Sequence, residues 1–75
     1  MDVSSFEEGQ TWLWQGLNDP DVNWTLWQVL EVENDDWMFV VTLASGAQNE
    51  RTDEVGFMYH MPTSCIMATC SKRMV

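Results

Sequence analysis

The sequence predicts an α+β domain in which an N-terminal helix packs on a three- to four-stranded antiparallel sheet. Three observations lead to this fold class. A helical pattern of apolar residues occupies residues 4–17, alternating apolar patterns occupy 23–33, 37–43 and 55–61, and polar turn sequences separate these segments. Seventy-five residues are enough for one small core, so residues 1–75 form a single domain.

The helix is expected because the segment begins with two overlapping Ser-x-x-Glu patterns, which are typical of helix starts. On a helix, Phe6, Leu13 and Leu17 would share one apolar stripe. Two glycines inside the segment oppose it, at about 1 kcal/mol each. The alternative is a strand at Thr11–Gln15, which would place its two tryptophans on one face.

An apolar hairpin follows, with strands over residues 23–33 and 37–43 joined at Asn34-Asp35-Asp36. We expect one face of this hairpin to be the core, made of Trp24, Leu26, Leu30, Val32, Phe39 and Val41. The opposite face of the first strand becomes acidic toward the turn. The second strand is apolar on both faces, so it should be covered on both sides.

The rest of the chain is less sharply defined. Residues 44–54 read as a polar loop, and 55–61 as a third strand that ends before a proline. The last segment fits a fourth strand at 65–69 or a short helix that begins at Thr63 or Ser64. The sequence leaves both options open.

The net charge of the chain restricts which molecules it can bind. Twelve Asp and Glu against three Lys and Arg give a net charge of −9. Residues 1–54 sum to −11, whereas residues 55–75 sum to +2. Direct binding to nucleic acid or to an anionic membrane needs Lys and Arg, so both are disfavoured. A basic protein surface is the natural partner of such a chain.

Nothing in the sequence indicates catalysis, and we expect neither a metal nor a cofactor. His60 is the one histidine, and no nucleophile signature lies near it. His60, Cys65 and Cys70 are one ligand short of a closed zinc site. The spacing of the two cysteines does not suit a disulfide, and the chain has no signal-peptide pattern and no long apolar run. We therefore expect reduced thiols and a cytoplasmic location, in the host cytoplasm if the protein is viral.

Recognition is the function that the sequence supports. The acidic residues gather at the start of the predicted helix and around the hairpin turn, with Trp27 and Trp37 beside the turn. Trp12 lies off the apolar stripe, as an exposed contact residue would. The candidate partner-binding residues are Glu31, Glu33, Asp35, Asp36, Trp27, Glu7, Glu8 and Trp12. They predict a non-enzymatic acidic inhibitor or nucleic-acid mimic that binds a basic, nucleic-acid-binding surface of another protein. The alternative is a structural or assembly subunit that uses exposed Trp and Met side chains, for example as a homodimer.

Two resemblances accompany these predictions. The segments VLEVENDDWMFV and GFMYHMP are similar to the middle and end of an SH3-like barrel, in which such a strand leads to an acidic turn and then a Trp. This resemblance implies a small SH3-like β-barrel as the alternative fold. By size and charge the chain also resembles the small acidic inhibitors of phages and plasmids, which include DNA mimics, restriction inhibitors and anti-CRISPR proteins.

Overall fold

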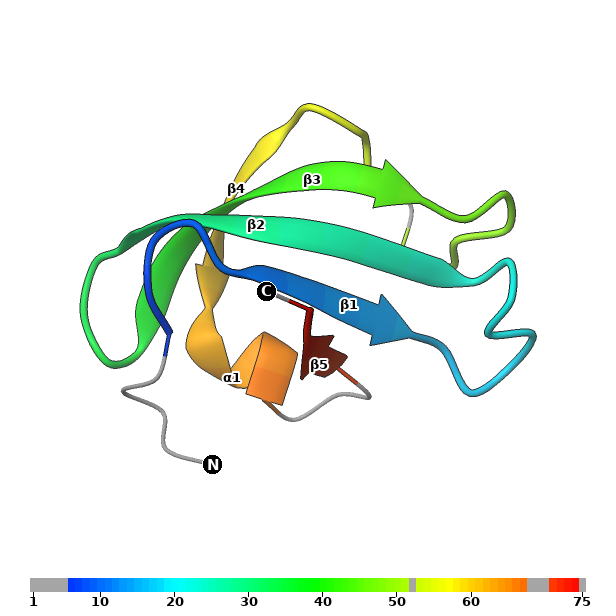
Figure 1. The fold of residues 1–75 in the computed structure, drawn as a ribbon, viewed down its shortest axis with the longest axis horizontal. Coiled ribbons are helices and arrows are strands. Elements are labelled where there is room, and N and C mark those ends of the chain that lie inside the picture. Colours follow the sequence, from blue (N-terminus) through cyan, green and yellow to red (C-terminus); the bar gives the residue numbers. More distant parts are fainter. Residues whose placement is uncertain (1–5, 52, 68–70, 75) are drawn as a thin grey trace.

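The computed structural model describes residues 6–51, 53–67 and 71–74, and it is built around one curved antiparallel sheet (Figure 1). Five strands lie in the order β4-β3-β2-β1-β5. The elements are β1 (Thr11–Gln15), β2 (Trp24–Val32), β3 (Trp37–Ser45), β4 (Met58–Pro62), α1 (Thr63–Met67) and β5 (Ser71–Arg73). The long strands β2 and β3 form the centre of the sheet, and β1 and β4 flank them.

The predicted α+β class with its N-terminal helix is wrong, because the described chain is nearly all sheet. Residues 4 and 5 of the predicted helix lie outside the described residues. In its place, residues 6–10 are irregular and Thr11–Gln15 form β1, which was the alternative. Because Trp12 and Trp14 are two residues apart, a strand directs both to one face, and pairing with β2 and β5 satisfies the backbone. The one helix in the described part of the chain is α1, with five residues. No helix there is long and apolar enough to cross a membrane. The SH3-like alternative stays compatible with this arrangement of strands.

Two β-bulges control which side chains face the core. Between β2 and β3, Val29 pairs with Val40 but Glu31 pairs with Phe39, which leaves Leu30 as an extra residue. A second register shift leaves Leu43 without a partner on β2. Because successive residues of a strand alternate between faces, each extra residue reverses the phase of all residues beyond it.

The core lies on the concave, inner face of the sheet. Its buried apolar residues are Phe6, Trp12, Trp27, Val29, Met38, Val40, Met61 and Ile66. The core face that the sequence predicted is therefore mostly wrong. Of its six residues only Val32 packs against this core, because the bulge at Leu30 returns it to the inner side. Leu30 is exposed, and the remaining four are half-buried on the opposite, outer face.

The hairpin turn lies where the sequence predicted it, and it also positions α1. Asn34 Oδ1 accepts the backbone N–H groups of Asp36 at 2.8 Å and Trp37 at 3.0 Å. Thr63, the first residue of α1, donates its hydroxyl to the Asp35 carbonyl at 2.8 Å and its N–H to the Asp36 carbonyl at 2.9 Å. The helix option for the last segment is thus the right one at residues 63–67.

The third strand was predicted with its start too early. The polar loop extends to residue 57, and β4 begins at Met58. Residues 55 and 56 form a turn beside β3. Two backbone hydrogen bonds attach this turn to Thr42: Gly56 N–H donates to the Thr42 carbonyl, and Thr42 N–H donates to the Phe57 carbonyl. Cys65 is a half-buried free thiol, whereas Cys70 lies outside the described residues.

Candidate protein-binding surface

Six acidic residues gather at the end of the sheet where the β2–β3 hairpin turns. Glu31 ends the outer side of β2, and Glu33, Asp35 and Asp36 surround the turn. The segment before β1 runs beside β2, because Gly9 N–H donates to the Val29 carbonyl at 2.8 Å. This contact holds the segment before β1, which includes Glu7 and Glu8, beside β2 at the same end of the sheet. Figure 1 shows this segment next to the β2–β3 hairpin. All six are exposed, and together they form the hairpin-end acidic cluster: Glu7, Glu8, Glu31, Glu33, Asp35 and Asp36.

Trp12 and Trp27, both predicted to contact a partner, belong to the core instead. Trp12 is 2% exposed and Trp27 is 0% exposed. They are cross-strand partners on the inner face, where the Phe6 ring lies 4.8 Å from that of Trp12 and the Arg51 guanidinium lies 4.6 Å from that of Trp27. By simple alternation along the strand, Trp27 and Glu31 would point to the same face of the sheet. The bulge at Leu30 places them on opposite faces instead.

The carboxylates of the acidic cluster are almost unneutralised. Glu33 Oε2 lies 2.8 Å from Nε2 of His60, in a contact exposed on both sides. The other five carboxylates make no ion pair in the part of the chain that the structure describes. Arg51 is directed away from the cluster, since its Nε lies 3.0 Å from Asp53 and its guanidinium covers two core tryptophans. The cluster therefore forms a negatively charged surface.

An aromatic group borders this cluster on the outer face. The imidazole of His60 stacks on Trp37, with ring centroids 4.7 Å apart, and on Phe39, at 4.6 Å. Trp37 is 39% exposed, so it is the tryptophan that the structure leaves beside the acids. The apolar character of both faces of residues 37–43 is the sequence signal for this group, although it predicts a strand that is covered on both sides.

The aromatic group is part of a larger apolar surface. Paired positions across β4, β3, β2 and β1 point outward together, for example Met58 with Val41 and Leu26 with Leu13. The outer face carries Leu13, Trp24, Leu26, Trp37, Phe39, Val41, Met58 and His60, and the polar residues Thr11, Gln15 and Gln28 lie among them. Their side chains range from half-buried to exposed, and Met58 is 60% exposed. The described part of the chain thus leaves this face in contact with solvent.

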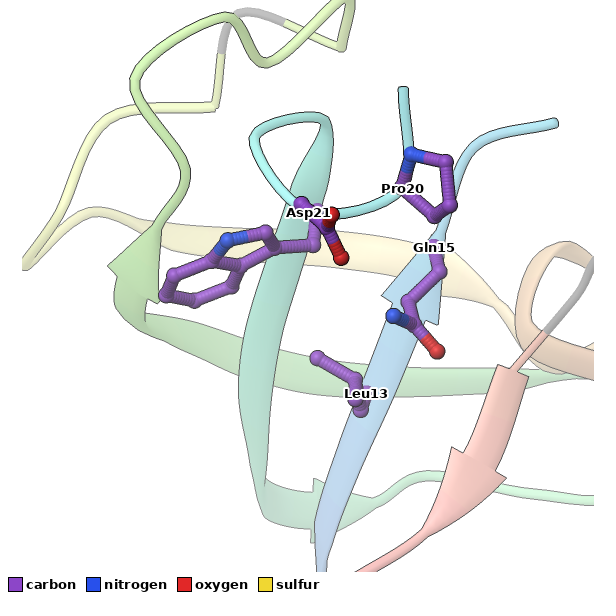
Figure 2. Close-up of a pocket in the computed structure, with 5 residues that line it drawn as sticks. Leu13, Gln15, Pro20 and Asp21 are labelled. Carbon is purple, nitrogen blue, oxygen red and sulfur yellow. The ribbon is translucent and has the colours of Figure 1, made fainter. Parts of the chain in front are cut away.

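A pocket lies at the end of the outer face remote from the hairpin turn (Figure 2). It has a volume of about 340 Å³ and is lined by Leu13, Gln15, Pro20, Asp21 and Trp24. In Figure 2, Leu13 and Gln15 come from β1, whereas Pro20 and Asp21 come from the β1–β2 loop. The pocket therefore combines an apolar wall with one carboxylate at its margin.

The loop that bears Asp21 is fixed by a buried amide. Asn23 is 2% exposed, and its Nδ2 donates to the Asn18 carbonyl at 3.1 Å and to Glu50 Oε2 at 2.9 Å. Its Oδ1 accepts the Glu50 N–H at 2.9 Å. These bonds join the β1–β2 loop to the loop after β3, so the pocket margin is preorganised.

These surfaces offer exposed carboxylates and apolar side chains. Among the described residues, no three His, Cys, Asp or Glu side chains lie close enough together to hold a metal ion. The acidic cluster suits Lys and Arg side chains, and the outer face suits apolar ones. Comparisons with protein-family models, with curated proteins and with solved structures found no match.

Proposed function

We propose that this protein is a small, non-enzymatic acidic inhibitor that binds a basic, nucleic-acid-binding surface of another protein, in the host cytoplasm if it is viral. The single observation that supports this proposal most is the hairpin-end acidic cluster, whose six carboxylates are exposed within a chain of net charge −9. A groove that normally holds phosphates offers Lys and Arg side chains, and carboxylates can replace the phosphates as their partners.

The rigidity of the turn also favours such a role. Asn34 fixes the turn from within, and Thr63 bonds the carbonyls of Asp35 and Asp36 from outside. The backbone that bears these two carboxylates is thus ordered before binding, which lowers the entropic cost of association. The phage inhibitors that the chain resembles in size and charge act on host enzymes that bind nucleic acid.

The test uses purified restriction endonucleases and CRISPR effector complexes, with labelled DNA as the competing ligand. Displacement of DNA should fall steeply with added salt, because the contacts are between charges. Asp35→Asn with Asp36→Asn should weaken displacement by about tenfold. Asp19→Asn with Glu54→Gln removes the same charge elsewhere and is the matched control. Displacement by none of the enzymes, or equal losses in both double variants, would refute the proposal.

A second function has one observation in its favour. Trp37 and Met58 are large, exposed apolar side chains, as an assembly subunit would require. In that case the chain should self-associate in sedimentation experiments, and Met58→Gln should reduce the self-association while added salt should not.

A further inference from the structure

We propose that the outer face of the sheet is a docking surface for a protein segment with an apolar centre and a Lys or Arg side chain near each end. This inference rests on the proposed function for the positive charge of the partner. It adds an apolar contact region to the hairpin-end acidic cluster, with which it shares Glu31 and Glu33.

The outer face of the sheet is largely apolar. It carries apolar or aromatic side chains from four strands, together with His60 and the polar residues Thr11, Gln15 and Gln28. In an antiparallel sheet with one face on the core, the other face meets water, and its side chains are normally polar. A largely apolar surface of this kind, exposed on a small protein, marks a contact site.

Carboxylates lie at both ends of the outer face. At one end, Glu31 pairs with Phe39 in the ladder. Glu33 contacts His60 at the same end, and the His60 imidazole stacks on Trp37 and on Phe39. At the other end, Asp21 lies at the margin of the pocket that includes Trp24. Each end therefore places a carboxylate beside an aromatic ring, and a guanidinium can stack on the ring while it pairs with the carboxylate.

A basic protein segment fits this surface better than nucleic acid or a second copy of the chain. Nucleic acid is anionic and would meet carboxylates at both ends of the surface. A second copy of the chain would bring another net charge of −9 and the same acidic ends. A basic partner with an apolar centre satisfies both the charges and the apolar area. Trp24 and Glu31 are seven residues apart along β2, so the two cationic groups of the partner should be separated by about 20 Å.

The test is a selection from a random peptide library on the immobilised full chain, followed by titration of the selected peptides. Enriched peptides should have an apolar centre flanked by Lys or Arg. Amide chemical-shift changes should map to the outer face. Met58→Gln should weaken binding by about fivefold, and Asp21→Asn and Glu31→Gln by a similar factor each. Val55→Gln is the matched control. The exposed fraction of Val55, 59%, is close to that of Met58, but Val55 lies in the loop before β4 and not on the outer face.

Several results would overturn the inference. These are no enrichment, enriched peptides without basic ends, shift changes away from the outer face, or equal effects of Met58→Gln and Val55→Gln. Self-association that Met58→Gln abolishes would assign the face to a second copy instead. DNA displacement that depends on Asp35 and Asp36 but not on Met58 would leave the proposed function intact and refute the docking surface alone.

Discussion

Thr42→Val should stabilise the protein, because the Thr42 hydroxyl is buried without a hydrogen-bond partner in the described structure. The backbone of Thr42 is satisfied, since its N–H donates to the Phe57 carbonyl and its carbonyl accepts the Gly56 N–H. A buried hydroxyl without a partner costs about 1–3 kcal/mol, and valine has nearly the same shape. The free energy of unfolding should therefore rise by about 1–2 kcal/mol, and the melting temperature by about 4–8 °C per kcal/mol.

Thr25→Val is the matched control on the same inner face. The Thr25 hydroxyl is equally buried, but it accepts the Asn49 Nδ2 hydrogen bond at 2.7 Å. Valine there removes the bond and leaves the amide of Asn49 without this acceptor, so stability should fall by about 1–2 kcal/mol. Urea unfolding, monitored by tryptophan fluorescence, measures both variants. If Thr42→Val destabilised the protein as much as Thr25→Val, the hydroxyl of Thr42 would have a partner and the reasoning would fail.

Three further predictions test the loops and the assignment of the two faces. Asn23→Ala should lower the free energy of unfolding by about 2–3 kcal/mol in the same urea assay, because it removes three hydrogen bonds from a buried site. Gly46→Ala should destabilise by about 1–3 kcal/mol in thermal unfolding, because the new Cβ would meet the Val22 carbonyl oxygen closely. Met61→Gln should cost at least 2 kcal/mol on the buried inner face, whereas Met58→Gln on the outer face should change stability by less than about 0.5 kcal/mol. Equal costs for the two methionine variants would contradict the assignment of inner and outer faces.

The hairpin could be predicted from the sequence because its signals are local. An Asn side chain can bond the backbone two and three residues ahead, and Asn34 does so. The first strand was harder, because Phe6, Leu13 and Leu17 fit a helical stripe whereas Trp12 and Trp14 fit a strand. Pairing with β2 and β5 decides between the two, and that pairing is a tertiary effect.

The core face could not be read from alternation, because a bulge does not appear in the sequence pattern. Trp27, Val29, Glu31 and Glu33 share one phase in β2, so the acids made this phase look solvent-exposed. The extra residue Leu30 places the two acids on the side opposite to the two apolar residues. The exposure of the acids followed from their charge alone, and the structure confirms that exposure. Their role in binding stays a prediction.

The same bulge connects the core to the candidate binding surface. Without the extra residue, Glu31 would share the inner face with Val29 and Val40, where an unpaired carboxylate would cost several kcal/mol. With it, Glu31 lies beside Phe39 on the outer face, and Val32 opposite Met38 completes the core. Bulges often redirect side chains next to functional sites. Here one extra residue both removes a charge from the interior and sets a carboxylate at the end of an apolar face, which is the arrangement that a partner with basic ends requires.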